Sequence, residues 1–167
     1  MKKAIIICGA PAAGKSTYAK KLASERGAMI LDIDEATEVL VRLGMELAGK
    51  DPDDRDSPFF KKSFREPIYC QMFSLARLNL PYVEVLIVGP FTRELNDPTW
   101  PERLEKHLGC EVEVHFVYAE PDIRRKRMIE RANPRDQSKL ERWSQHLEYY
   151  RGCEFPVCKH ARVDTSS

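Results

Sequence analysis

The chain has 167 residues, which is enough for one domain to bury most of its apolar surface in a single core. Its 27 basic and 26 acidic residues give a net charge of +1, which excludes a strong field for long nucleic acid or an anionic membrane. No stretch approaches the ~20 apolar residues of a membrane span. Five cysteines, an odd number without a disulfide-framework spacing, indicate a reducing cytoplasm.

The first predicted element is a buried strand over residues 3–8, where Ile5, Ile6 and Ile7 form an apolar β-branched run. Because this run ends at once in a glycine-rich loop, we reject a signal peptide. The loop, residues 9–17, reads Gly-Ala-Pro-Ala-Ala-Gly-Lys-Ser-Thr and fits GxxxxGK[ST] at every fixed position. A helix is predicted over residues 15–26, and a strand followed by a helix is the context in which this motif binds phosphate.

The motif predicts how ATP is held. Glycines let successive backbone N–H groups turn toward phosphate oxygens, and the positive end of the following helix faces the same anion. Lys15 can reach the β- and γ-phosphates, and the Ser16 hydroxyl can ligate Mg²⁺. The alternative, a chance glycine-rich turn, does not explain the strand, helix, lysine and serine together. The predicted ATP-binding loop comprises Gly9, Ala10, Pro11, Ala12, Ala13, Gly14, Lys15, Ser16 and Thr17.

A second strand is predicted over residues 28–32, and Asp34 is a candidate N-cap for the helix that follows. Residues 50–58 are polar, acidic and hold two prolines, so we expect a mobile loop there. A third helix is expected over residues 67–79. The second helix has an apolar face at helical spacing, which is typical of a helix packed on a core: Ala36, Val39, Leu40, Leu43 and Leu47.

In the second half of the chain, strands and helices continue to alternate, which implies a parallel sheet covered on both faces. We expect strands over residues 83–88, 112–118 and 161–164. A short helix should run over 99–109, where Thr99 and Glu102 have capping-box spacing. A basic helix over 121–132 should stop before Pro134, and another helix should cover 138–150 and end at Gly152.

Asp32 and Asp34 follow the second strand, at the edge of an open parallel sheet where ligands bind. Alternation along an extended segment would place both carboxylates on one side. Phosphoryl transfer to a hydroxyl needs a carboxylate to accept its proton, and Mg²⁺ prefers oxygen ligands, often through water. The alternative is that Asp34 only caps the next helix, and capping and catalysis can coexist.

Arg124, Arg127 and Arg131 lie on one face of the basic helix, and Arg135 follows in the next loop. Guanidinium groups can neutralise charge on a transferring phosphoryl group. The alternative is a solvated basic face, which is the common meaning of a charge run.

Weaker signals are candidate acceptor contacts at Arg65, Tyr69 and Arg93, for which surface charge is an equal explanation. Cys153, Cys158 and His160 supply three zinc-type ligands without a fourth nearby, so we do not expect zinc. His115 has no visible partner. The strand over 83–88 ends without the acidic residue of water-splitting P-loop motors, and no Asn-Lys-x-Asp guanine-reading sequence is present. Both absences disfavour a motor or a GTP switch.

With these residues placed, the chain resembles small P-loop kinases of the nucleoside, shikimate and gluconate kinase group, and also bacterial polynucleotide-kinase-like and chloramphenicol-phosphotransferase-like ATP-binding proteins. The resemblance rests on residues 9–17, Asp32 and Asp34, the segment 88–93, and the arginines of 127–136. It implies an α/β fold: one P-loop NTPase domain over 1–167, three-layer α/β/α, with a five-stranded parallel sheet in order 2-3-1-4-5. It also implies an acceptor-binding region at about 34–80 and a helical lid at about 121–137.

The resemblance also implies roles for single residues. Asp34 would match the carboxylate that binds the acceptor hydroxyl, and Asp32 would match the one near Mg²⁺. Arg65, Tyr69 and Arg93 are candidate acceptor contacts from their positions alone, and Ser16 is a candidate Mg²⁺ ligand from the phosphate-loop motif. The arginines Arg127, Arg131 and Arg135 would contact ATP from the lid. The residues expected to act in catalysis are Lys15, Asp34, Arg127 and Arg131.

The sequence therefore predicts a cytoplasmic, ATP- and Mg²⁺-dependent kinase, a phosphotransferase with a small-molecule hydroxyl as acceptor. We expect no membrane partner and no nucleic acid beyond a short end. One alternative is a 5′-hydroxyl nucleic-acid kinase, since a short end needs only a few arginines. Another is a nucleotide-binding regulator without chemistry, which would have no need of a base after the second strand.

Overall fold

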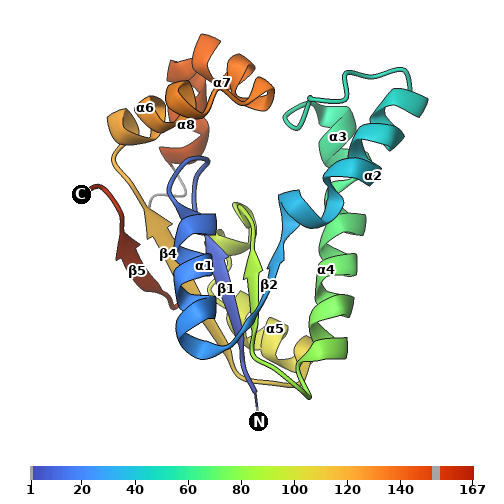
Figure 1. The fold of residues 1–167 in the computed structure, drawn as a ribbon, viewed down its shortest axis with the longest axis vertical. Coiled ribbons are helices and arrows are strands. Elements are labelled where there is room, and N and C mark those ends of the chain that lie inside the picture. The colour runs from blue at the N-terminus through green and yellow to red at the C-terminus, as the bar shows by residue number, and fades with distance from the viewer. Residues whose placement is uncertain (1, 152–154) are drawn as a thin grey trace.

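The computed structural model describes residues 2–151 and 155–167. Its five strands form one parallel sheet in the order β2-β3-β1-β4-β5, as expected (Figure 1). Consecutive strands are connected through helices, which is the pattern of a parallel sheet covered by helices on both faces. The strands are β1 (Ala4–Cys8), β2 (Met29–Asp32), β3 (Val85–Val88), β4 (Val112–Tyr118) and β5 (Ala161–Asp164).

The central strand β1 is enclosed on both faces, because all five of its residues are fully buried. Ile5 and Ile7 point to the face covered by α1 (Lys15–Arg26). Ile6 and Cys8 point to the opposite face, which α4 (Arg65–Asn79) and α5 (Trp100–Leu108) cover. Burying one such aliphatic side chain contributes ~1.5–3 kcal/mol, so this strand anchors the loop that follows it.

The turn from β1 into α1 depends on glycine. Gly9 has a φ of 140°, and a Cβ at this position would lie 2.2 Å from the carbonyl oxygen of Val117. Gly14 has a φ of 94° and stands at the N-cap of α1. Both positions therefore need the conformational freedom of glycine, and the second also leaves room beside Thr165.

The remaining helices stand in two groups above the carboxyl ends of the strands, one on each side of the phosphate loop (Figure 1). The α2–α3 arm comprises residues 33–63 and contains α2 (Ile33–Leu47) and α3 (Pro58–Ser63). The helical cap comprises residues 121–151. Its elements are α6 (Pro121–Arg131), the 3₁₀ turn η2 (Pro134–Asp136), α7 (Gln137–Glu141) and α8 (Trp143–Arg151).

Several boundaries differ from the prediction. The loop predicted over 50–58 ends in a short helix, α3, which begins at Pro58 after the N-cap Ser57. The helix predicted over 138–150 is broken at Arg142 into α7 and α8, and its expected stop at Gly152 lies outside the described residues. Another 3₁₀ turn, η1 (Glu94–Asn96), precedes α5. Thr99 does not cap α5, since its hydroxyl donates to Asp97 instead.

Two expectations about α2 were wrong. Its N-cap is Asp32 and not Asp34, because the Asp32 carboxylate accepts the backbone N–H of Asp34 at 3.1 Å. Asp34 therefore lies in the first helical turn, where it was expected to be extended. The apolar face Ala36, Val39, Leu40, Leu43 and Leu47 is exposed, and the helix packs on the core through Ile33, Val41 and Met45.

His115 was expected to lack a partner, and this was wrong as well. Its Nδ1 lies 2.8 Å from the Tyr18 hydroxyl and its Nε2 3.3 Å from Glu113, which also pairs with Lys3. Burial lowers the pKa of His115 despite the neighbouring carboxylate. Within residues 2–151 and 155–167, no helix has the length and apolarity needed to cross a membrane.

Candidate functional site

The phosphate loop lies at the carboxyl end of β1, between the α2–α3 arm and the helical cap. The Lys15 ammonium donates to the carbonyl oxygens of Gly9 and Ala10, each at 2.9 Å, so it folds back over its own loop. Burial lowers the pKa of Lys15 to about 8, although Asp34 and Asp32 partly oppose this. A nearby anion, such as a phosphate group, would therefore stabilise the charged form of Lys15.

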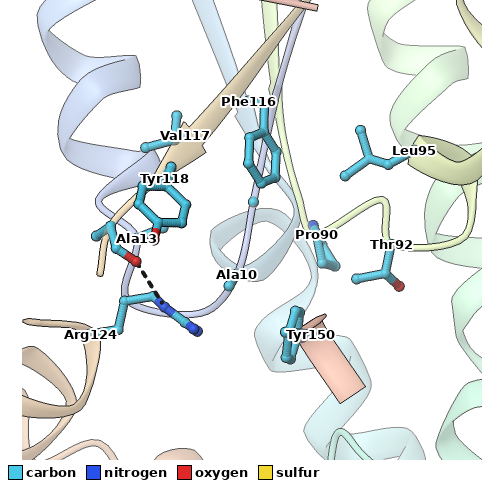
Figure 2. A pocket seen from close by; sticks show the side chains of 12 residues that line it. Ala10, Ala13, Pro90, Thr92, Leu95, Phe116, Val117, Tyr118, Arg124 and Tyr150 are labelled. Carbon is cyan, nitrogen blue, oxygen red and sulfur yellow. Dashed lines mark hydrogen bonds between the residues drawn. The ribbon is translucent and has the colours of Figure 1, made fainter. Parts of the chain in front are cut away.

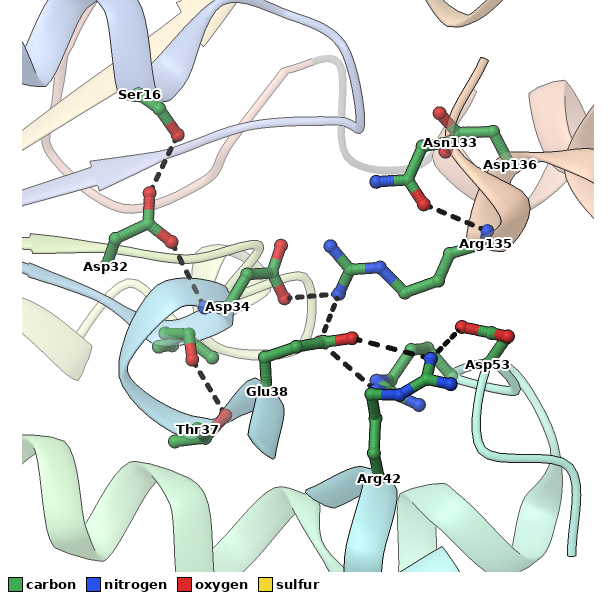
Figure 3. Close-up of polar contacts among 12 residues, drawn as sticks. Ser16, Asp32, Asp34, Thr37, Glu38, Arg42, Asp53, Asn133, Arg135 and Asp136 are labelled. Carbon is green, nitrogen blue, oxygen red and sulfur yellow. Dashed lines mark hydrogen bonds and ion pairs between the residues drawn. The ribbon is translucent and has the colours of Figure 1, made fainter. Parts of the chain in front are cut away.

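Ser16, Asp32 and Asp34 form a short chain of contacts beside this loop (Figure 3). The Ser16 hydroxyl donates to one oxygen of Asp32 at 2.7 Å, and the other oxygen accepts the backbone N–H of Asp34. One hydroxyl and one carboxylate fit the hard oxygen donors that Mg²⁺ prefers. Across the part of the chain that the structure describes, no three acidic, histidine or cysteine side chains converge on a metal position. Phosphate oxygens and water would have to complete the shell of a magnesium ion here.

The four arginines predicted to act together have different surroundings. Arg127 donates to the carbonyl oxygen of Ala12 at 3.4 Å, and it also binds the hydroxyl of Thr165 at 3.1 Å and its carbonyl at 2.5 Å. Thr165 in turn donates to the carbonyl of Ala13 at 2.6 Å. Arg127 therefore lies against the phosphate loop itself.

Arg131 and Arg135 lie at the far end of α6 and in η2. Arg131 forms a bidentate pair with buried Asp136 at 2.5 and 2.8 Å, and its charge helps lower the pKa of Lys15. Arg135 donates to Asp34 at 3.3 Å and to Glu38 at 3.1 Å (Figure 3). Arg135 therefore contacts Asp34, the candidate base.

Arg124 is almost fully buried and so is not part of a solvated face. Its Nε donates to the carbonyl of Ala119 at 3.2 Å, and its guanidinium lies 5.9 Å from the ring of Trp143. Arg124 lines a small cavity of about 10 Å³ beside the phosphate loop. Figure 2 shows its side chain among the others that line this cavity. The cavity joins the ends of three strands and the cap, and its lining includes Gly9, Ala10, Pro90, Thr92, Tyr118 and Tyr150.

The sequence reading missed a charged cluster on the arm. Glu38 accepts from Arg55 at 3.1 Å and lies 3.9 Å from Arg42, which also pairs with Asp53. Arg55 is held by the carbonyl of Pro52 at 2.6 Å. The spacing of Glu38 four residues after Asp34 could have revealed the carboxylate, since both lie on one helical face. No local pattern marks Arg55, because its position depends on how the loop folds.

Contacts also join the arm to the cap. Glu38 accepts Arg135, and Lys139 lies 3.1 Å from Asp56. The Lys61 ammonium lies 4.8 Å from the ring centre of Tyr149. The two helix groups therefore meet through polar side chains beyond the phosphate loop.

The candidate acceptor residues are only partly brought together. Arg65 pairs with Glu94 at 2.8 Å and lies 5.1 Å from the ring of Tyr69. Tyr69 is buried and stacks on Phe91 with ring centres 4.9 Å apart, and burial raises its pKa. Arg93 is exposed at the start of η1. The packing therefore explains Tyr69 as a core residue as well as it explains a ligand contact.

The zinc ligands considered from the sequence cannot be assembled from the structure. Cys153 lies outside the described residues, and Cys158 is buried in the main core cluster. His160 points its Nδ1 at the carbonyl oxygen of Cys158 at 2.8 Å.

Comparisons with known proteins place this chain in a family. The sequence profile of a family described as an AAA domain matches residues 5–153. A UPF0200 protein of Saccharolobus islandicus is 34% identical over 142 residues, which cover 83% of this chain and 69% of that protein.

Solved structures show the same fold. A candidate kinase of Chloroflexus aurantiacus matches with a TM-score of 0.68 at 19% identity, over 99% of this chain and 89% of that chain. A gluconokinase of Sinorhizobium meliloti matches with a TM-score of 0.55 at 15% identity, over 99% and 83% of the two chains. The fold is that of small P-loop kinases.

Proposed function

The chain belongs to the AAA domain family, and on that premise we propose that it transfers the γ-phosphoryl group of ATP to a hydroxyl group of a small molecule. The observation that carries the proposal is the meeting of three kinds of group at one sheet edge. A phosphate loop with a half-buried lysine stands beside a hydroxyl–carboxylate pair, and the carboxylate of Asp34 follows on the arm. Phosphoryl transfer to a hydroxyl uses groups of these kinds: a phosphate cradle, a metal-holding pair and a base.

The phosphate loop supplies binding and charge. Backbone N–H groups of residues 9–17 would surround the β-phosphate, and Lys15 would leave its carbonyl partners to bind the β- and γ-phosphates. Ser16 and Asp32 would hold Mg²⁺, which neutralises charge on the phosphates when it is bound. Arg127 and Arg131 would stabilise the oxygens of the transferring group.

Asp34 is the proposed base. Its side chain is two-thirds exposed and lies 3.3 Å from Arg135, so an acceptor hydroxyl can reach the carboxylate. The acceptor O–H bond breaks as its proton moves to Asp34, and the acceptor oxygen forms a bond to the γ-phosphorus. The bond from the γ-phosphorus to the bridging oxygen breaks, and ADP leaves with that oxygen.

The remaining assignments follow from position. The acceptor would lie between the arm and the cap, in a region that includes residues 34–80, with Arg65, Tyr69 and Arg93 as candidate contacts. Residues 121–137 would act as a lid that excludes water when nucleotide binds. Arg135 connects the two regions, because it touches Asp34 and Glu38 while it belongs to the lid.

An ADP-release screen tests the proposal. Purified protein with Mg·ATP is offered nucleosides, sugars, aminoglycoside- and phenicol-type alcohols, and 5′-hydroxyl oligonucleotides. We expect acceptor-dependent ADP release that Lys15→Ala abolishes and that Lys20→Ala, an exposed control on the same helix, leaves unchanged. Release from Lys15→Ala equal to that of the unmodified chain would rule out the phosphate loop as the ATP site. A response to oligonucleotides alone would favour the nucleic-acid kinase.

A further inference from the structure

The outer face of α2 carries an apolar stripe that nothing in the described structure covers. Val39, Leu40, Leu43 and Leu47 are 50–81% exposed, and Ala36 continues the row at the N-terminal end. The helix already has a separate buried face, formed by Ile33, Val41 and Met45. The stripe is therefore an additional apolar surface and not a poorly packed core face. Figure 1 shows α2 running along an outer edge of the molecule.

From this stripe we infer that two copies of the chain associate through α2, packed antiparallel about a two-fold axis. The stripe suits pairing with itself. When the axis passes between Val41 and Arg42, Leu40 of one copy faces Leu43 of the other, and small Ala36 faces large Leu47. A two-fold interface uses one patch twice, so it requires self-complementarity of this kind.

The available area fits a weak dimer. The stripe exposes on the order of 500 Å² on each copy, so two copies bring together roughly 1,000 Å², close to the lower limit for a specific interface. Phe59 on α3 is also partly exposed and adds to this area, because Lys50 and Phe64 connect it to the last turns of α2.

The charges allow a second copy to approach. A net charge of +1 gives little long-range repulsion between two identical chains. Glu35, Glu46 and Lys50 lie toward the two ends of the stripe, and Arg42, which borders its middle, is paired with Glu38 and Asp53. The stripe is therefore an apolar row with a polar rim. This is the usual anatomy of a protein–protein interface.

Association would also steady the arm. Asp34 and Glu38 lie in the first turns of α2, on a different face from the stripe, and Glu38 binds Arg55 and Arg135. A partner packed along the outer face of α2 would restrain the helix without closing the site. The inference itself does not depend on the proposed kinase activity.

Sedimentation velocity of the full chain over about 1–100 µM tests the dimer. We expect a reversible dimer with a micromolar dissociation constant. Leu40→Glu should raise that constant at least ~30-fold, because it buries an unpaired carboxylate at the centre of the interface. Leu78→Glu, at a similarly exposed leucine on α4, is the matched control and should leave it unchanged. Circular dichroism checks that both variants fold.

Disulfide trapping tests the register. In a background of Cys70→Ser and Cys153→Ser, which removes the exposed thiol of the described residues and the cysteine outside them, Leu40→Cys mixed with Leu43→Cys should form a covalent heterodimer faster than either variant alone. Monomeric unmodified chain up to about 100 µM would overturn the inference and leave the stripe to a different protein. So would a dimer that Leu40→Glu does not weaken, or one that Leu78→Glu weakens equally.

Discussion

The phosphate loop follows a strand whose five residues are fully buried, whereas the α2–α3 arm and the helical cap meet through half-exposed charged side chains. At the start of the phosphate loop, close packing permits a single backbone conformation, since a Cβ on Gly9 would clash with the backbone of Val117. Ion pairs of partly exposed side chains are worth little each, typically ~0–1 kcal/mol. The first region is thus suited to holding a nucleotide in one geometry, and the second to movement around an acceptor.

The largest expected effect is at the rigid end of this comparison. Gly9→Ala should destabilise the fold by more than ~4 kcal/mol, because the new Cβ would lie 2.2 Å from a backbone oxygen at an unfavourable φ. Gly49→Ala, in the loop of the arm, should cost only ~1 kcal/mol, since its φ is also positive but no atom lies nearby. Urea unfolding measures both, and equal losses would remove the contrast.

The next effect concerns chemistry on the arm. Asp34→Asn cannot accept a proton and should lower kcat by ~10²–10⁴-fold, toward the lower end because a loose transfer asks little of its base. ATP affinity should hardly change. Asp32→Asn should instead raise the Mg²⁺ concentration needed for activity, since it removes the negative charge of the carboxylate proposed to hold the ion beside Ser16.

Single-turnover kinetics on the acceptor found by screening separate these outcomes. Glu35→Gln is the matched control, because Glu35 is exposed in the same helical turn and has no role in the proposed mechanism. Near-normal turnover in Asp34→Asn would move the catalytic assignment to another carboxylate, and Glu38 would be the first to test.

A pH dependence follows from the enclosed lysine. Burial lowers the pKa of Lys15 to about 8. In the nucleotide-free protein the charged ammonium therefore predominates below that pH, where it lowers the stability of the fold, and the neutral amine predominates above it. Affinity for an ATP analogue should therefore fall ~10-fold per pH unit above about 8, with proton uptake on binding. Calorimetry in buffers of different ionisation enthalpy measures the uptake. A flat profile up to pH 10 would show that the ammonium does not meet the phosphates.

The smallest expected effect is in the cap. Backbone amides of residues 121–137 should exchange ~10-fold more slowly when a non-hydrolysable ATP analogue is bound, because closure over the nucleotide would shield them. Those of α5, which covers the sheet face opposite α1, should not change. Equal protection of 121–137 in both states would show that this segment does not close over the nucleotide. Arg127, Arg131 and Arg135 would then only stabilise the fold.

The central strand and the phosphate loop could be predicted from the sequence because both depend on local signals, whereas the sheet order was predicted only through the resemblance to small P-loop kinases. The apolar run at Ile5–Ile7 marks the central strand, and the spacing of glycines, Lys15 and Ser16 marks the loop. Helix α1 has the bounds that were predicted for it. Its ends are set by Gly14 and Gly27, which act within one turn of the backbone.

The arm could not be predicted to the same extent. The row from Ala36 to Leu47 has the spacing of a core face, yet the core took the adjacent face of Ile33, Val41 and Met45. Periodicity alone does not say which of two apolar faces meets the sheet. The Asp32 cap and the pairing of Arg55 with Glu38 depend on where the chain turns after β2 and how the loop 48–57 folds back.

Transfer of labelled phosphate tests the central claim most directly. ATP carrying ¹⁸O in its γ-phosphoryl group is incubated with the protein, Mg²⁺ and the acceptor identified by screening. The masses of the products are then measured by mass spectrometry. We predict a phosphorylated acceptor that has gained the labelled phosphoryl oxygens while keeping its own bridging oxygen, and no such product with Lys15→Ala. Labelled inorganic phosphate without any phosphorylated acceptor would contradict a kinase and indicate ATP hydrolysis instead.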